Sequence, residues 1–212
     1  MMADDASAVA RSLGLKKIDV FGWSMGGTTA ILMAVRHPGL VDKQIVLSAP
    51  SRRGGWYPHV QAGFEQWKPE MFVGTPVERQ YRKESATPNA LPALVDKMRV
   101  METTNYDVTP AELRAIPGKT MIIVGDADGV ALSHAIELFE ARGGHNMPAA
   151  TQGFVSGSPK ARLAILPATG HIAMLNEAPL IARYVTAFLD DQKPAPTIGF
   201  FEGMDKPTAK SE

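Results

Sequence analysis

The chain has 212 residues, and its 22 lysines and arginines balance its 22 aspartates and glutamates. This length suits a single well-buried domain, and the balanced charge argues against a nucleic-acid partner, which usually requires a basic patch. The absence of cysteine excludes a disulfide framework, a thiolate metal site and a catalytic thiol, and it fits a cytoplasmic protein. No apolar run approaches the roughly 20 residues that cross a bilayer, so we expect a soluble protein without membrane contact.

The first elements in chain order are a helix, a strand and a second helix. Apolar residues recur at helical spacing between Ala6 and Leu13, with two aspartates before them and a glycine after them, which predicts a short helix. The acidic start of the chain has neither the basic nor the apolar region of a secretory signal. Residues 17–21 predict a buried strand. Residues 25–35 predict an apolar helix that ends before a His-Pro pair, because the residue before proline disfavours helical geometry.

Strands and helices alternate again in the second half of the chain. Residues 44–48, 120–124 and 162–166 are short apolar runs that predict three further buried strands. Residues 134–142 and 180–189 carry the apolar spacing of helices. Short apolar strands that alternate with helices are typical of an α/β fold, with a mostly parallel sheet covered on both faces.

One long segment, residues 51–116, interrupts this alternation. It contains no convincing strand, carries many charges and scattered aromatic residues, and is too long for a simple loop. We expect a mainly helical cap that lies over the end of the sheet and is inserted between the two parts of a core, residues 1–50 and 117–192. Residues 193–212 are rich in proline, glycine and lysine, which predicts a flexible tail.

The first strand and the second helix are joined by the sequence GWSMGG, residues 22–27. Small residues on both sides of Ser24 at this spacing are typical of a nucleophile elbow, a strained turn that raises a serine hydroxyl above the end of a sheet. Ser24 would then stand at a helix start, where the amide of Met25 can donate to an oxyanion. The alternative is a glycine-rich helix start that merely packs closely. The glycine motifs of phosphate and dinucleotide sites are absent from the sequence.

A serine becomes a nucleophile near neutral pH only when a base and an acid support it. In the elbow fold these groups follow the serine in the chain, each after a later strand. Asp126 and Asp128 come directly after the third predicted strand, and His171 comes after the fourth. Because the carboxyl ends of parallel strands meet at one edge of the sheet, these side chains can converge on Ser24.

With these motifs the sequence resembles the α/β-hydrolase superfamily, in particular its esterases and cofactor-free haloperoxidases. The segments that carry the resemblance are GWSMGG at 22–27, GDAD at 125–128, and Gly170 with His171. The resemblance covers about residues 4–191, with segment 51–116 in the place of the family's cap. It implies that the acid is Asp128 rather than Asp126, which would then cap a turn.

The resemblance implies a serine hydrolase that cleaves small carboxylic esters or lactones and needs neither a metal nor an organic cofactor. Ser24 would attack the carbonyl carbon, His171 would carry the proton to the leaving alcohol, and Asp128 would orient His171. The amide of Met25 would stabilise the oxyanion. The expected lining of the substrate pocket is aromatic and comprises Trp23, Trp56 and Trp67. Perhydrolysis of the haloperoxidase type is the alternative within the same chemistry, because it differs only in the accepted nucleophile.

The sequence departs from the family at its start. Full members have about four strands before the elbow, including a His-Gly loop that supplies a second oxyanion donor, whereas residues 1–23 contain no histidine. Removal of one such donor typically lowers the rate by about 100- to 1000-fold, so we expect weak activity.

Without those preceding strands, residues 17–21 would present an apolar edge. Such an edge invites pairing with a second copy of the chain, which predicts a homodimer, or with the apolar residues 198–201 of the tail. Three interpretations stay open: a natural short hydrolase, a truncated product, and a non-catalytic binding form of the fold.

Overall fold

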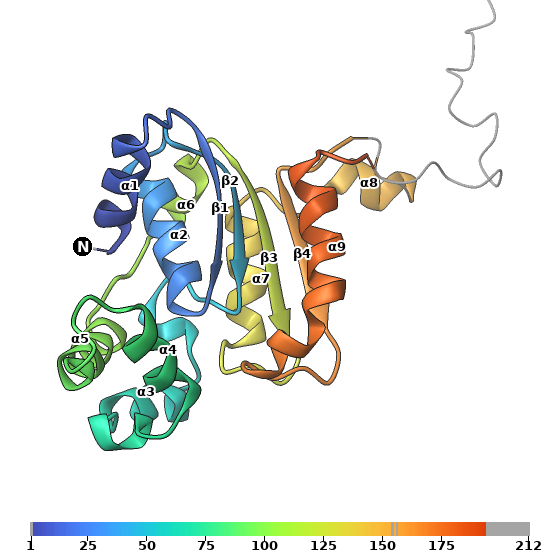
Figure 1. Cartoon of the computed structure of the whole chain (residues 1–212). Helices are drawn as coiled ribbons and strands as arrows, with labels where there is room; N and C mark the ends of the chain where they lie inside the picture. The colour runs from blue at the N-terminus through green and yellow to red at the C-terminus, as the bar shows by residue number, and fades with distance from the viewer. Residues whose placement is uncertain (1, 154, 156, 194–212) are drawn as a thin grey trace, which may run out of the picture.

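The computed structural model of the chain describes residues 2–153, 155 and 157–193, so the predicted tail, including residues 198–201, lies outside the described residues apart from Lys193. Figure 1 shows a central sheet with helices on both of its sides. The elements in chain order are α1 (Met2–Ser12), β1 (Ile18–Trp23), α2 (Met25–Arg36), β2 (Val41–Leu47), α3 (Pro58–Glu65), α4 (Pro76–Glu84), α5 (Leu91–Thr103), α6 (Pro110–Ala115), β3 (Lys119–Gly125), α7 (Leu132–Ala141), α8 (Met147–Gln152), β4 (Ala161–Leu166) and α9 (Ala178–Leu189). Three short 3-10 helices lie at Arg53–Gly55, Pro69–Phe72 and Ala173–Glu177.

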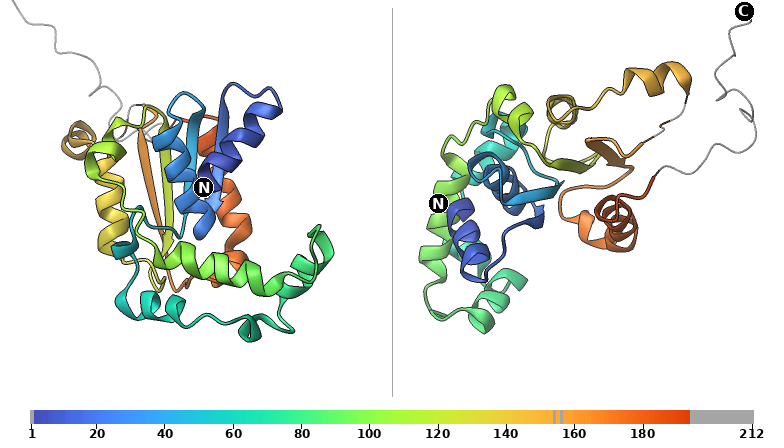
Figure 2. Two further views of the ribbon diagram at one scale, coloured as in Figure 1. Left: turned by 90° about the vertical axis from the view of Figure 1, so that its left-hand side faces the viewer. Right: turned by 90° about the horizontal axis from the view of Figure 1, so that it is seen from above.

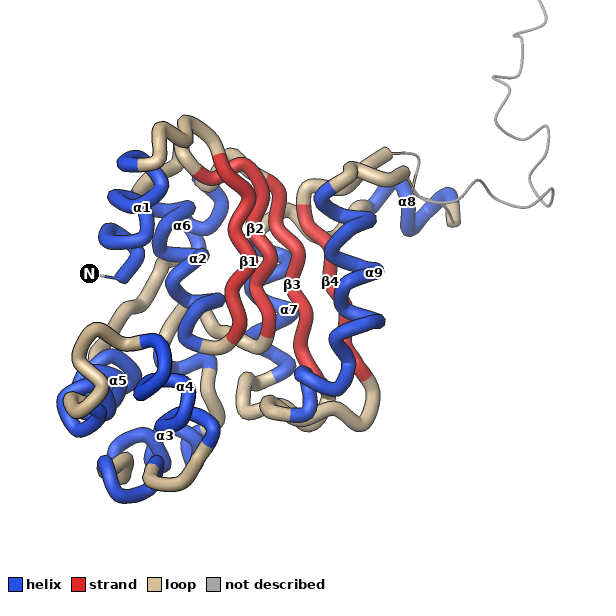
Figure 3. The backbone as a smooth tube through the Cα atoms, in the orientation of Figure 1, coloured by secondary structure: helices blue, strands red, loops and turns tan. Residues whose placement is uncertain are grey.

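The strands form one parallel sheet in the order β1-β2-β3-β4, so neighbours in space are also neighbours in the chain. Parallel pairing requires a crossover between successive strands, and helices occupy each of these crossovers. The tube in Figure 3 shows the strands side by side, with helices in front of and behind them. The mostly parallel α/β sheet that the sequence predicts is therefore confirmed.

Two apolar clusters, one on each face of the sheet, form the core. Successive side chains of a strand point to opposite faces, so Val46 and Ile122 join the cluster made with α2 and α7, whereas Ile45 and Ile123 join the cluster made with α9. These four residues are at most 2% exposed. Burial from both faces explains why β2 and β3 are apolar without the alternation of a half-exposed strand.

The prediction that the first strand is buried is wrong for part of β1. Asp19 and Phe21 are exposed, and Phe21 keeps 51% of its accessible surface. These side chains are exposed because β1 is an edge strand of the described sheet, and α9 does not cover the face of β1 to which they point. An apolar groove lined by Phe21, Trp23 and residues of α9 runs between the two elements. Pairing of this edge with a second copy of the chain stays a prediction.

Residues 51–116, called the insert below, contain helices α3 to α6. In Figure 1, α3, α4 and α5 lie below α1 and α2, to the left of the carboxyl ends of the strands. The right-hand view of Figure 2, seen from above, also places α5 to one side of the sheet. The last helix of the insert, α6, instead packs beside the sheet against α7 and α2. None of the helices in the described ranges is long and apolar enough to cross a membrane.

Candidate active site

Ser24 occupies the turn between β1 and α2 in a strained backbone conformation. Its φ of 56° and ψ of −126° lie outside the regions that residues other than glycine usually adopt. The turn is tight enough to require glycine nearby, since a Cβ on Gly22 would stand 2.1 Å from the carbonyl oxygen of Gly26. A Cβ on Gly27 would lie 2.5 Å from the Cβ of Ala49. Gly22 and Gly27 therefore allow the strand and the helix to meet closely enough to present Ser24.

Three side chains form a continuous series of hydrogen bonds at the carboxyl ends of β1, β3 and β4. Nε2 of His171 lies 2.9 Å from Oγ of Ser24, and Nδ1 of His171 lies 3.0 Å from Oδ1 of Asp128. When Nδ1 donates to the carboxylate, Nε2 is free to accept the serine proton. A hydroxyl, an imidazole and a carboxylate in this series are the arrangement that converts a serine into a nucleophile.

The amide of Met25 lies next to this series. Met25 is the first residue of α2, so its N–H is one of the helix-start donors that no carbonyl of the same helix accepts. The helix dipole adds partial positive charge at this point. The site can therefore supply a hydrogen-bond donor to an oxyanion formed near Ser24.

Asp128 is fully enclosed, with no exposed surface on its side chain. Burial alone would raise the pKa of Asp128, but hydrogen bonds from His171 and from the Val130 amide, with the nearby Ser48 hydroxyl, hold that pKa below its usual value. Among the described residues, neither the buried Ser48 hydroxyl nor the buried Oδ2 of Asp128 has a partner within hydrogen-bond geometry. Ser48 ends the second predicted strand just where the site assembles, but no motif in the sequence singles it out as a site residue.

Asp126 does not reach His171. Its Oδ1 accepts a hydrogen bond of 3.2 Å from the amide of Thr169, which joins the loops that follow β3 and β4. These loops approach so closely that a Cβ on Gly125 would stand 1.8 Å from the Thr169 carbonyl oxygen. The two aspartates of the GDAD segment therefore have different partners. Asp128 contacts the imidazole of His171, whereas Asp126 holds the loop that carries His171.

Two of the three predicted pocket tryptophans contact the imidazole. The ring of Trp23 stacks on His171 with a centroid separation of 5.5 Å, and the ring of Trp56 meets it edge-on at 5.5 Å. Trp67 contacts Phe64 at 5.1 Å, and Phe64 in turn contacts Trp56. The structure therefore brings Trp23 and Trp56 to His171 and leaves Trp67 further out in the insert.

His134 lies outside this site and instead fixes the start of the insert. The side chain is buried, and its Nε2 accepts a 3.0 Å hydrogen bond from the amide of Ser51. A Cβ on Gly55 would come within 2.4 Å of the imidazole, so the chain passes directly against it. Burial, together with the charge of Arg52, lowers the pKa of His134, and Glu137 opposes this only in part.

We expect mild acid to destabilise the protein through His134. A lowered pKa means that the unfolded chain takes up this proton at a higher pH than the native protein does. The stabilisation is complete above the ordinary histidine pKa of about 6.5 and is lost as the pH falls below it. Urea denaturation at about pH 7.5 and about pH 5.5 measures how far the free energy of unfolding falls between the two pH values. This fall should be smaller for His134→Gln, whose side chain does not titrate, than for the wild type. Equal losses would contradict this role.

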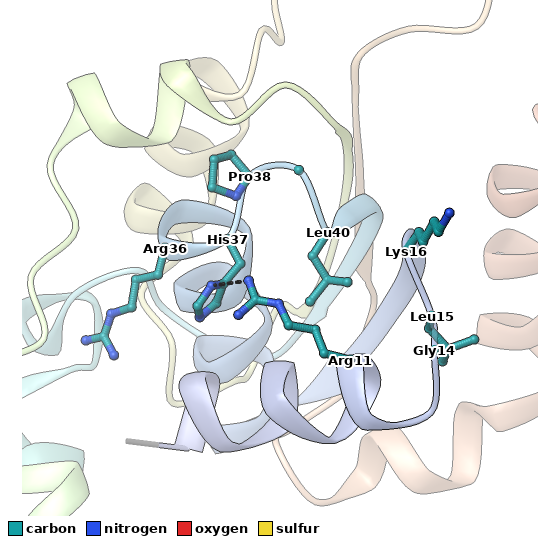
Figure 4. A pocket seen from close by; sticks show the side chains of 9 residues that line it. Arg11, Gly14, Leu15, Lys16, Arg36, His37, Pro38 and Leu40 are labelled. Carbon is teal, nitrogen blue, oxygen red and sulfur yellow. Dashed lines mark hydrogen bonds between the residues drawn. The ribbon is translucent and has the colours of Figure 1, made fainter.

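A separate open pocket lies at the opposite end of α2 (Figure 4). His37 follows this helix, as the sequence predicts, and its Nδ1 accepts from Arg11 at 3.1 Å while Nε2 lies 3.1 Å from Asp4. The full length of α2 separates this pocket from Ser24. Across the described ranges, no group of three or more histidine, aspartate and glutamate side chains is arranged to hold a metal ion.

Solved structures with similar folds include two hydrolases. A carboxylesterase from the ammonia-oxidizing Thaumarchaeon Nitrososphaera gargenis superposes with a TM-score of 0.63 at 17% identity, over 89% of this chain and 70% of that chain. The enol-lactonase from Burkholderia xenovorans LB400 superposes with a TM-score of 0.56 at 17% identity, over 89% of this chain and 71% of that chain. At these identities the likeness concerns the fold alone.

The sequence also matches a curated enzyme over part of its length and a protein-family model over most of its length. A segment of 82 residues is 37% identical to a homoserine O-acetyltransferase of Thermus thermophilus, and it covers 36% of this chain and 22% of that enzyme. The chain thus matches only about a fifth of the length of that curated relative. The model of the alpha/beta hydrolase family matches residues 2–183, which is most of the chain. The chain therefore belongs to the alpha/beta hydrolase family.

Proposed function

We propose that the chain is a serine hydrolase that cleaves small carboxylic esters or lactones. The observation that carries this proposal is the series of hydrogen bonds from Ser24 through His171 to Asp128, with separations of 2.9 and 3.0 Å. The strained turn at Ser24 supports it as well, because strain of this kind concentrates at functional sites.

The reaction begins when Oγ of Ser24 attacks the carbonyl carbon and its proton passes to Nε2 of His171. Asp128 holds the imidazole in the tautomer that can accept this proton and stabilises the imidazolium that forms. The amide of Met25 donates to the oxyanion of the tetrahedral intermediate. Collapse of the intermediate transfers the proton from His171 to the leaving alkoxide oxygen and leaves an acyl group on Ser24.

A water molecule completes the cycle. His171 takes a proton from this water as it attacks the acyl carbonyl carbon, and the same proton then returns to Oγ of Ser24 when the acid is released. Trp23 and Trp56 flank His171 with apolar ring surfaces, which suits a small acyl or alkyl group. Lactones fit the same chemistry, because a cyclic ester opens on Ser24 without a separate leaving group.

Hydrolysis of a panel of substrates tests this proposal. We expect the wild type to hydrolyse p-nitrophenyl esters of short acids, or small lactones, and Ser24→Ala to lose this activity. With Met25 as the oxyanion donor, the rate should be modest, since each such donor typically contributes about 100- to 1000-fold. Ser12→Ala, which alters an exposed serine of α1, serves as the matched control and should keep the wild-type rate. Equal rates for Ser24→Ala and the wild type would contradict the proposal.

A further inference from the structure

A mostly apolar pocket of about 240 Å³ lies beside Met25 and is not part of the hydrogen-bonded series. Met25 and Thr28 line it from the start of α2, and Glu102 lines it from α5. Tyr106 closes it from the segment after α5, and the Tyr106 hydroxyl accepts a 3.1 Å hydrogen bond from Nε1 of Trp56. Met25 directly follows Ser24, and Tyr106 is hydrogen-bonded to Trp56, whose ring contacts His171. The pocket therefore lies near the place where an acyl group would sit on Ser24.

Glu102 stands out in this pocket as a buried acid without a partner. The residue is 5% exposed, and within the described ranges its carboxyl group has neither a hydrogen bond nor an ion pair. The other charged residue of the lining, Arg36, is by contrast paired with Asp4 at 2.7 Å. Burial raises the pKa of Glu102 to about 7, and the charge of His171 acts in the opposite direction. A carboxylate in such surroundings costs stability unless a cation joins it.

The position of Glu102 on α5 directs it inward. Leu91 and Val95, at 3% and 0% exposure, lie 11 and 7 residues earlier on the same helix face. The face of α5 that carries Leu91 and Val95 is buried, and the helical spacing predicts an apolar residue at position 102. A glutamate there breaks the apolar pattern of the buried face at the point where it borders the pocket.

We propose that this pocket binds the cationic amino group of an ester substrate, which pairs with the carboxylate of Glu102 while the ester carbonyl lies at Ser24. This inference rests on the proposed function of Ser24. It narrows the substrate class to esters that carry an ammonium group on the acyl side. The apolar lining would contact the methylene groups between the ammonium and the carbonyl, and the number of these groups sets which ester fits.

Matched pairs of substrates test the role of Glu102. Ethyl esters of ω-amino acids of increasing length are compared with ethyl esters of alkanoic acids of the same length, and acid release is followed in a pH-stat. We expect the wild type to prefer the ammonium ester at one chain length by about tenfold or more, the range of a hydrogen bond to a charged group. Glu102→Gln should lose this preference.

Glu70→Gln, which changes an exposed glutamate of the insert, is the control and should keep the preference. A ratio of ammonium to neutral ester that is the same in the wild type and in Glu102→Gln would overturn the inference. Activity on neutral esters in both proteins would show that the proposed function holds even when this inference fails.

If the chain hydrolyses neither the ω-amino esters nor the alkanoic esters, a binding measurement tests whether the pocket takes an ammonium group. Calorimetric titration of Ser24→Ala with each pair of esters measures binding without turnover. Tighter binding of the ammonium ester, lost in the double variant Ser24→Ala with Glu102→Gln, would support the pocket even though hydrolysis had failed. Equal binding of the charged and neutral esters would overturn it.

Discussion

Replacement of Asp128 by asparagine should lower kcat/KM for a small ester by about 1000- to 10,000-fold without unfolding the protein. Oδ1 of Asp128 accepts from Nδ1 of His171 and from the Val130 amide. An asparagine that presents its NH₂ group to His171 would favour the tautomer with the proton on Nε2. That nitrogen could then no longer accept the proton of Ser24. The Val130 amide would lose its acceptor, but the shape of the side chain would be almost unchanged.

The neighbouring Asp126 provides a matched control for this experiment. Its Oδ1 accepts from the Thr169 amide, and an asparagine oxygen can accept the same bond, so Asp126→Asn should keep most of the activity. Both variants should be compared by kcat/KM over a range of pH and by thermal unfolding. A larger loss of activity in Asp126→Asn than in Asp128→Asn would contradict the assignment of the acid.

Replacement of Arg142 by methionine should lower the free energy of unfolding by about 3 kcal/mol. Arg142 is 1% exposed and donates to the carbonyl oxygens of Leu113 and Gly118 and to Oγ1 of Thr120. These bonds join the end of α7 to α6 and to the start of β3. Burial lowers the pKa of Arg142 to about 10, so enclosing this charge has a cost. Methionine removes that cost but also removes three hydrogen bonds from a charged donor, and we expect this loss to be larger. Oγ1 of Thr120 keeps its bond from Gln44, and the Leu113 carbonyl keeps its bond from the Ile116 amide.

Arg114→Met is the matched control, because Arg114 is exposed on α6 one residue after Leu113. Its free energy of unfolding should stay within about 0.5 kcal/mol of the wild type. Urea denaturation followed by circular dichroism measures both variants, and the slopes should be compared along with the midpoints. A methionine at position 142 that proved neutral or stabilising would show that burial of the charge outweighs its hydrogen bonds.

The helices and strands of the sheet could be predicted from the sequence because their signals are local. An apolar run such as residues 120–124 indicates a buried strand by itself, and β3 extends over Lys119–Gly125. The positions of Asp128 and His171 just after two strands were enough to predict convergence, since parallel strands end at one edge. Both side chains indeed lie within hydrogen-bond distance of their expected partners.

Features that depend on packing between distant segments could not be predicted from local patterns. The exposure of Phe21 follows from what lies beside β1 and not from its own neighbours in the chain. Arg142 and Glu102 are charged residues that sequence patterns would place in solvent, yet both are buried. For Glu102 the available signal was its helical spacing from Leu91 and Val95, which places a charge on an apolar face.

Intact mass after incubation with a fluorophosphonate shows whether Ser24 is an activated nucleophile. Such a probe reacts with a serine only when a neighbouring base has made it nucleophilic. We expect a single covalent adduct on the wild type and none on Ser24→Ala. A folded wild-type protein that gained no adduct would contradict the proposed role of Ser24.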